Sequence, residues 1–296
     1  MEITLYSRGG AGEVTGSRHF LEVNGETLGI DCGAFQGKRK ESDEKNRSGF
    51  EDVEKLSSLI LTHGHFDHCG LLPLLVKKGF AGNIYSTPAT RDIASLILMD
   101  SARIQARDRE YLAKQAAKRG EVFTWEPLYD ETDVLKAVDR FVTVSYRRPL
   151  PLGGGMSLEF YDAGHILGSS LAVLTIKNGK TKKENIEGEI RIVFSGDLGR
   201  KGKPIIRDPQ KVPAPDFLIM EGTYGDRLHE PTSGSLDKLE QVVNEAVDRG
   251  GKVLIPAFAV GRTQELVYYF HILTDEKRIP DLPIYVDSPM ATNATG

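Results

Sequence analysis

The sequence predicts an α/β fold, and three observations along its 296 residues support this prediction. Short apolar runs separated by glycines within residues 3–31 are typical of strands joined by tight turns. A long helical pattern begins at Thr87-Pro88 and reaches Arg119. After Thr232 the helix and strand patterns alternate, which indicates an open α/β unit.

The elements are expected in the following order. Residues 33–52 are charged and contain several glycines, so they are expected to form a surface loop. Residues 70–78 and 87–119 are expected to be helical, and residues 177–189 to form a solvated hairpin loop. Strands are expected at residues 3–5, 18–23, 27–31, 58–61, 141–144, 158–162, 171–176, 190–194 and 217–220. In the last part, helices are expected at residues 236–248 and 263–273, and strands at 253–256 and 284–286.

The composition sets limits on the class of protein. With 40% hydrophobic and 27% charged residues, the chain can bury a full core. A net charge of -4 excludes a uniformly basic coat for nucleic acid but leaves a local basic cleft open. The two cysteines, Cys32 and Cys69, provide no disulfide framework and fit a reducing compartment. We therefore expect a cytoplasmic protein with no membrane segment, and no nucleotide cofactor.

The densest group of chemically active residues follows the predicted strand at 58–61. His63, His65, Asp67 and His68 lie within six positions, and imidazole nitrogens with carboxylate oxygens suit Zn(II). Residues two apart can point to the same side, so His63 and His65 are expected to hold one ion. Asp67 and His68 then face a second ion. The alternative is a set of capping or solvent-facing polar residues, but unpaired buried polar groups cost free energy.

In two further segments, a predicted strand and a glycine are followed by a residue that can bind a metal ion. They end in His165 and Asp197, and small neighbours allow the backbone to approach a metal closely. The two oxygens of Asp197 could bridge two cations. The alternatives are a core histidine and a turn residue. Asp31 is expected to accept a hydrogen bond that orients a ligand histidine, or simply to form a turn.

Other polar residues are weaker candidates. Arg262 opens a predicted helix and could bind a substrate phosphate, although a surface salt bridge is the alternative. Ser169 could also bind substrate, or fill a turn. The basic residues of 103–109 indicate a solvated helix face rather than an RNA track.

The loop from His63 to His68 has the form His-x-His-x-Asp-His and, with the other positions in order, resembles the metallo-β-lactamase superfamily. Residues 221–227, 256–262 and 286–291 resemble segments of its β-CASP branch. That branch contains the endonuclease subunit of messenger 3′-end processing, relatives of ribonuclease J, and DNA-repair nucleases.

The resemblance implies a metallo-β-lactamase αββα sandwich over residues 1–226 and the amino-terminal part of a β-CASP domain over residues 227–296. It implies two Zn(II) ions, with Mn(II) as a substitute, held by His63, His65, Asp67, His68, His165 and Asp197. The implied reaction is hydrolysis of a phosphodiester bond in single-stranded RNA by metal-activated water. Asp67 would also orient the nucleophile, and Glu221 would hold a proton-donating histidine.

Family members continue past Asp287-Ser288-Pro289-Met290 and supply two further histidines to the site. We therefore expect this chain to be an amino-terminal portion of a longer protein, or a natural truncation. A homodimer is one way to cover the sheet edge that such a truncation exposes. Two other functions stay open: hydrolysis of a small ester, thioester or lactone, and non-catalytic RNA binding. Cleavage polarity and the choice between RNA and DNA are not predicted.

Overall fold

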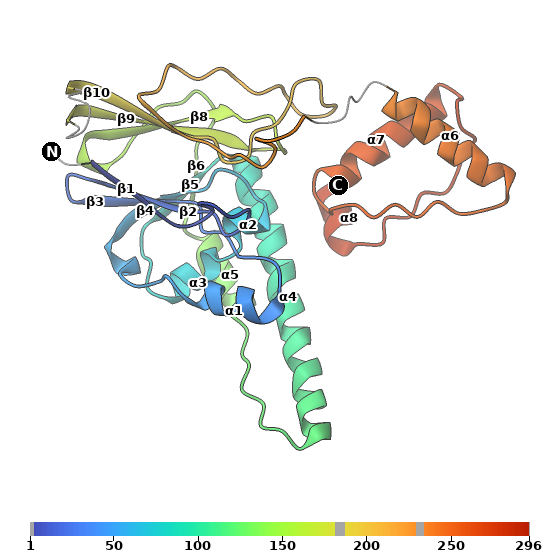
Figure 1. Ribbon diagram of the computed structural model, residues 1–296, viewed down its shortest axis with the longest axis horizontal. Helices are drawn as coiled ribbons and strands as arrows, with labels where there is room; N and C mark the ends of the chain where they lie inside the picture. The colour runs from blue at the N-terminus through green and yellow to red at the C-terminus, as the bar shows by residue number, and fades with distance from the viewer. Residues whose placement is uncertain (1–2, 181–186, 229–233, 296) are drawn as a thin grey trace. The chain divides into compact units, whose positions relative to one another are not determined.

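The structure is a computed structural model that describes residues 3–180, 187–228 and 234–295 (Figure 1). The chain divides into two compact units. The first contains residues 1–201 and 208–221, and the second contains residues 202–207 and 222–296. The assignment of residues 1–226 and 227–296 to two named domains stays a prediction. We describe each unit by itself.

The first sheet of the larger unit contains six strands that follow one another in chain order. They are β1 (Ile3–Gly9), β2 (Arg18–Val23), β3 (Glu26–Ile30), β4 (Leu56–Ile60), β5 (Asn83–Ser86) and β6 (Phe141–Thr143). The strands β1 to β3 are antiparallel, whereas β3 to β6 are parallel. Because parallel strands end at the same edge of a sheet, the loops that follow β3 and β4 meet there.

The second sheet has the strand order β11, β10, β9, β8, β7. Its strands are β7 (Leu150–Pro151), β8 (Met156–Asp162), β9 (Ser170–Lys180), β10 (Glu187–Phe194) and β11 (Phe217–Ile219). Alternate residues of β8, such as Leu158 and Phe160, pack against Ile30 and Ile60 of the first sheet. The period of two places Tyr161 on the opposite face, where it belongs to a cluster that includes Leu198.

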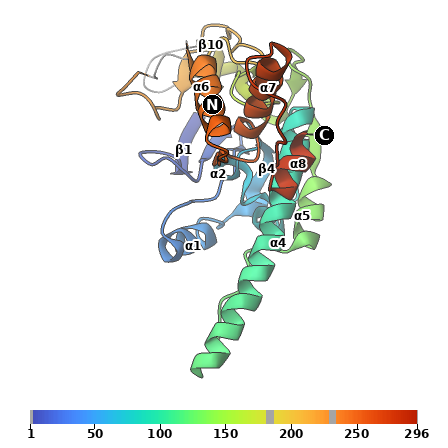
Figure 2. The same ribbon diagram turned by 90° about the vertical axis from the view of Figure 1, so that its right-hand side faces the viewer.

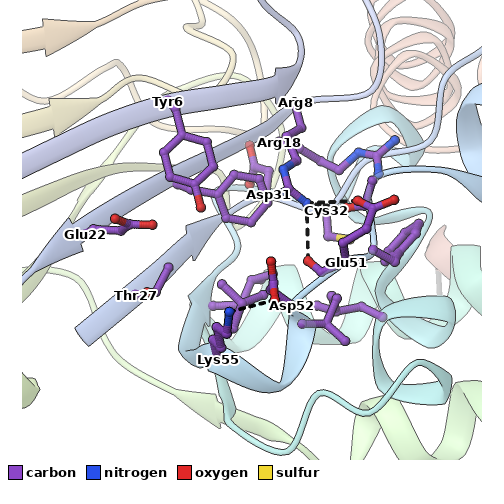
Figure 3. A pocket seen from close by; sticks show the side chains of 17 residues that line it. Tyr6, Arg8, Arg18, Glu22, Thr27, Asp31, Cys32, Glu51, Asp52 and Lys55 are labelled. Atoms are coloured by element: carbon purple, nitrogen blue, oxygen red, sulfur yellow. Dashed lines mark hydrogen bonds and ion pairs between the residues drawn. The ribbon is translucent and has the colours of Figure 1, made fainter. Parts of the chain in front are cut away.

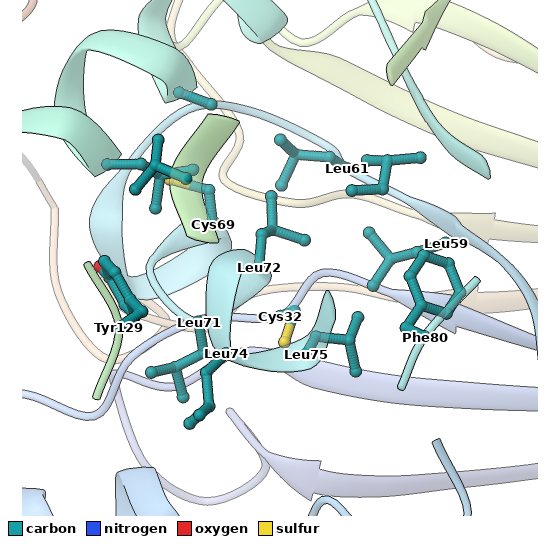
Figure 4. Packing of buried hydrophobic residues seen from close by; sticks show 14 of the residues in the cluster. Cys32, Leu59, Leu61, Cys69, Leu71, Leu72, Leu74, Leu75, Phe80 and Tyr129 are labelled. Carbon is teal, nitrogen blue, oxygen red and sulfur yellow. The ribbon is translucent and has the colours of Figure 1, made fainter. Parts of the chain in front are cut away.

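Helices cover the other face of the first sheet. They are α2 (Phe66–Cys69), α3 (Leu72–Lys77), α4 (Pro88–Arg119) and α5 (Glu131–Val138). Figure 4 shows the apolar layer between them and the sheet, in which Leu59, Leu72 and Phe80 are fully buried. The mixed α/β class and the two facing sheets are as predicted. On the outer face of the second sheet, the described residues of this unit contribute an extended segment that includes Val212 rather than a helix.

Some predicted elements of this unit are wrong. The expected loop at 33–52 contains the helix α1 (Arg39–Arg47), whose charged residues hid its periodicity. The helix α5 was not predicted, although Asp130 and Asp133 form a capping box at its start. The expected hairpin loop at 177–189 is partly strand, because β9 and β10 extend into it. Its residues 181–186 lie outside the described residues.

The smaller unit contains α6 (Ser235–Asp248), α7 (Arg262–Asp275) and α8 (Pro289–Thr295). Val243 of α6 and Leu273 of α7 are buried in its core. The strands expected at 253–256 and 284–286 are absent from the described residues of this unit. Neither segment has a partner strand there, and Leu254 and Tyr285 are exposed, so the β pattern has nothing to pair with. Among the described helices, none combines the length and apolar character that a membrane crossing requires.

The burial of both cysteines gives a test of this packing. Cys32 and Cys69 are buried, and burial raises the pKa of the Cys32 thiol to about 12 and that of Cys69 well above its usual range. Both thiols are therefore protonated at pH 8, and the thiolate is the reactive form. We expect the native protein to react with a disulfide reagent at pH 8 about a thousandfold more slowly than the denatured chain. Equal rates in the two states would contradict the packing.

Candidate metal centre

Four loops meet at the carboxyl ends of the strands and bring the predicted ligands together. His63 and His65 follow β4, and Asp67 and His68 lie on the short helix α2. The other three positions come from separate loops. His165 lies between β8 and β9, Asp197 follows β10, and Asp31 follows β3. The strand ends therefore carry all seven residues to one edge of the two facing sheets.

Four side chains surround one point at this edge. The Nδ1 atom of His65 lies 3.1 Å from the Nε2 atom of His63 and 3.1 Å from that of His165. The Oδ2 atom of Asp197 lies 3.7 Å from His63 Nε2 and 3.5 Å from His165 Nε2. A tetrahedral zinc ion with bonds of about 2.0–2.1 Å needs ligand atoms about 3.3–3.4 Å apart. The four side chains thus fit one divalent ion in both chemistry and spacing.

The second oxygen of Asp197 faces a different imidazole, that of His68. Asp197 Oδ1 lies 3.1 Å from His68 Nε2, while Oδ2 faces the imidazoles of His63 and His165. Asp67 is not among the four converging atoms but lies close enough to His68 and Asp197 to respond to their charges. Burial raises the pKa of Asp67, and the Asp197 charge raises it further against the opposing effect of His68. One carboxylate therefore joins two groups of ligands.

Asp31 fixes the orientation of His68. Its Oδ2 atom lies 2.7 Å from His68 Nδ1. Asp31 also accepts hydrogen bonds from the backbone N–H of Thr62 at 2.9 Å and from the hydroxyls of Thr62 and Ser17. Because a carboxylate only accepts, His68 donates from Nδ1 and turns Nε2 toward Asp197. This is the geometry that an orienting acceptor would have.

The electrostatics of the centre favour a cation. Burial, with the neighbouring imidazoles, holds the pKa of His63 well below its usual value, so its ring is neutral and keeps a free lone pair. Burial lowers the pKa of His68, but the carboxylates of Asp31 and Asp197 outweigh burial and raise it overall. Three carboxylates, including Asp67, thus lie among neutral or partly charged imidazoles, an arrangement that a divalent ion would neutralise.

Backbone hydrogen bonds hold these loops against one another. The N–H and the hydroxyl of Ser170 both donate to the Thr62 carbonyl at 2.9 Å, which ties the two sheets together beside the ligands. Gly199 donates to Ala163 at 2.9 Å. A Cβ atom on Gly33 would lie 1.6 Å from the carbonyl oxygen of Asp67, so this close approach requires glycine. These contacts between loops could not be predicted from the sequence, because they join residues far apart along the chain.

The weaker candidates have other contacts. Ser169 is fully buried, and its Oγ accepts the N–H groups of His165 at 3.0 Å and Ile166 at 3.3 Å. It braces the His165 turn, and its burial gives no support to a substrate contact. In the smaller unit, Arg262 is the first residue of α7 and forms an ion pair with Glu265 at 3.1 Å, the surface salt bridge that was the alternative.

Glu221 contacts the loop that carries Asp197. Its Oε1 atom accepts the N–H of Leu198 at 2.6 Å, and its own N–H donates to the Ser195 hydroxyl at 3.1 Å. Leu198 and Ser195 lie on either side of Gly196 and Asp197 in the sequence. Glu221 therefore supports this ligand loop, a contact that the separation of 24 residues between Asp197 and Glu221 conceals in the sequence.

Asp31 also lines a cavity of about 130 Å³ (Figure 3). Arg18, another lining residue, is buried and donates to the carbonyls of Lys45 and Ser48 at the end of α1, where a cation is favoured. Its Nε atom has no hydrogen-bond partner among the described residues. Because acidic and basic side chains both line the cavity, we assign it no ligand.

Comparisons with known proteins agree with the geometry. A family model described as the Metallo-beta-lactamase superfamily matches residues 15–167. Ribonuclease TTHA0252 of Thermus thermophilus is 37% identical over 285 residues, which cover 96% of this chain and 58% of that protein. Transcription termination factor FttA of Methanosarcina mazei is 32% identical over 96% of this chain and 42% of that protein. Endoribonuclease YSH1 of Candida glabrata is 27% identical over 98% of this chain and 36% of that protein.

The hydrogen bond between Asp31 and His68 gives a test of the centre. We expect Asp31→Asn to weaken zinc binding about 10- to 100-fold, because the amide has one acceptor oxygen for the N–H groups of both His68 and Thr62 and lacks the negative charge. The measurement is competition with a chromophoric chelator, with circular dichroism to check the fold.

The matched control is Ser17→Ala, which removes one hydrogen bond to Asp31 and leaves the bond to His68 intact. Its zinc affinity should stay within about threefold of the parent. If folded Asp31→Asn binds zinc as tightly as the parent, the orienting role is wrong.

Proposed function

Because the chain belongs to the metallo-beta-lactamase superfamily, we propose that it is a metal-dependent ribonuclease that hydrolyses phosphodiester bonds of single-stranded RNA. Its curated relatives are β-CASP RNA-processing nucleases, among them ribonuclease TTHA0252 and endoribonuclease YSH1. The chain spans 58% and 36% of the lengths of these two relatives, so the activity of the whole protein is part of the proposal. The same holds for the division into domains at residues 226 and 227.

One observation carries this proposal. Asp197 presents Oδ2 to His63 and His165 and Oδ1 to His68. A carboxylate shared in this way suits a site for two metal ions about 3.5–4 Å apart, the separation found in two-metal hydrolases of phosphate esters. A binding protein would have no need to gather four imidazoles and three carboxylates at one edge of the sheets and to bury His63, His68 and Asp31 among them, since burial of polar groups costs free energy.

The protein's own residues would divide the chemical work. Two zinc ions, or manganese in their place, would activate a water molecule and stabilise negative charge on the phosphate. The Asp67 carboxylate would accept a hydrogen bond from the attacking water and direct it in line with the phosphorus. His68, held by Asp31, would keep Asp197 in its shared orientation.

Glu221 and Arg262 are assigned supporting roles. Glu221 uses Oε1 to hold the loop of Asp197, and among the described residues no hydrogen bond engages Oε2. That oxygen would hold and polarise a proton-donating histidine for the leaving group. In the smaller unit, the exposed guanidinium of Arg262 at the start of α7 would exchange its partner Glu265 for a substrate phosphate.

Substitution of Asp67 tests the mechanism. We expect Asp67→Asn to lower the rate of RNA cleavage about 100-fold or more, because the amide is a poorer acceptor for the water proton. The control, Asp139→Asn, alters an exposed aspartate at the end of α5 and should cleave at the parental rate. The measurement is the product ladder from 5′-labelled single-stranded RNA. It should be run on this chain and on one extended past Gly296. Parental cleavage by Asp67→Asn would refute the assignment.

Metal removal tests the class of enzyme. A chelator should abolish cleavage, and added zinc or manganese should restore it. The metal content, measured by mass spectrometry, should approach two ions per chain. If metal-loaded protein hydrolyses a small ester but not RNA, the substrate assignment falls. If it binds RNA and two ions without cleaving, a non-catalytic function replaces the proposal.

A further inference from the structure

The carboxyl-terminal half of α4 projects from the larger unit. In both Figure 1 and Figure 2 it extends well beyond the sheets and the other helices of that unit. The buried residues of α4 confirm this, because after Ala102 only Ala116 is buried. We call residues 103–119 of α4 the arm. A projecting helix that buries so few residues gains little stability from tertiary packing, so most of the surface of the arm is free to contact a partner.

The arm has a charge opposite to that of the whole chain. Residues 103–119 contain six arginines and lysines and two acidic residues, a net charge of +4. The complete chain has a net charge of -4. A local concentration of one sign in a protein of the other sign creates a field that attracts oppositely charged partners.

The two sides of the arm differ in their contacts. The segment after α4 runs back along one side, where Gln105 accepts the N–H of Leu128 and Arg109 pairs with Glu126. The opposite side carries four exposed residues at intervals of four, three and four positions, the spacing of one helix face. These residues, which we call the stripe, are Arg107, Tyr111, Lys114 and Lys118.

The side chains of the stripe are available to bind a partner, because they make few contacts that stabilise the fold. Three other charged residues of the arm have ion-pair partners: Arg103 pairs with Glu131, Asp108 with Arg39 and Arg109 with Glu126. The three stripe cations have no ion pair in the described part of the chain, although Glu110 lies beside them in the sequence. Tyr111, between the cations, is 61% exposed. Proteins that bind single-stranded nucleic acid combine such groups: the aromatic ring stacks on a base, and the cations contact the phosphates.

We propose that the stripe is a second RNA-binding surface, which holds the part of a long single strand that lies outside the metal centre. The identity of the polymer as RNA rests on the proposed function. The start of α4 abuts the ligand loops, because Thr87 and Thr90 both donate to the carbonyl of Gly168 at 2.7 Å. The stripe begins 17 residues after Thr90, or about 25 Å along the helix axis. A trinucleotide in the metal centre is too short to reach it, whereas a strand of 24 nucleotides is long enough.

A charge-neutralised stripe tests this proposal. The test variant combines Arg107→Gln, Lys114→Gln and Lys118→Gln, and the matched control combines Lys40→Gln, Lys78→Gln and Lys252→Gln. The control removes the same charge from exposed residues elsewhere. Both are made in the Asp67→Asn background, so that the RNA stays intact. The measurement is fluorescence anisotropy of a 24-nucleotide oligouridine over a range of salt concentrations, with circular dichroism to check helix content.

We expect the stripe variant to bind the oligouridine about tenfold more weakly than the control at low salt. Its log–log salt dependence should be shallower by about 2, since each lost contact with a single strand removes about 0.7. Equal affinities and equal slopes for the two variants would overturn the proposal. So would the absence of any binding of the oligouridine by the unaltered stripe.

Tyr111 separates RNA from other anionic partners. Tyr111→Ala should weaken oligouridine binding about fivefold or more by loss of stacking. Binding of inorganic polyphosphate, which has no bases, should not change. If polyglutamate displaces the oligouridine as well as unlabelled RNA does, the stripe binds an acidic protein and the RNA assignment is wrong. Cleavage of a trinucleotide by metal-loaded protein tests the proposed function separately, because it does not involve the stripe.

Discussion

The metal centre depends on the position of the Asp197 carboxylate, whose two oxygens contact two different groups of imidazoles. One oxygen faces His63 and His165, and the other faces His68. This division requires that the loop after β10 keep one conformation. The hydrogen bonds from Leu198 to Glu221 and from Gly199 to Ala163 supply that constraint. The centre is therefore positioned by the backbone around the ligands as much as by the ligands themselves.

In the larger unit, the topology of the sheets determines where the candidate ligands lie. Because β3 and β4 are parallel, Asp31 and His63 leave the first sheet at the same edge. The bonds from Ser170 to Thr62 join the second sheet to that edge. The helix α4 starts at the same loops and carries the stripe away from them. A single helix thus connects the metal centre at its start to the stripe near its end.

The convergence of His63, His65, His165 and Asp197 could be predicted from the sequence, because each of them follows a strand. The His-x-His-x-Asp-His spacing lies within six residues, so His63 and His68 could be recognised as candidate ligands without knowledge of the tertiary structure. The support from Ser169 and Glu221 arises from contacts that only the fold creates. The strand predicted at residues 253–256 is wrong for a related reason, since a strand forms only where a second strand pairs with it. The helix α1 was missed because its charge suggested a loop.

The most direct test is the location of the metals by anomalous X-ray scattering from crystals grown with zinc. Our account predicts one peak about 2.0–2.2 Å from the ligand atoms of His63, His65, His165 and Asp197. A second peak should lie about 3.5–4 Å from the first, next to the other oxygen of Asp197. Imidazoles that point away from a common centre, or fully loaded crystals without a peak between them, would contradict it.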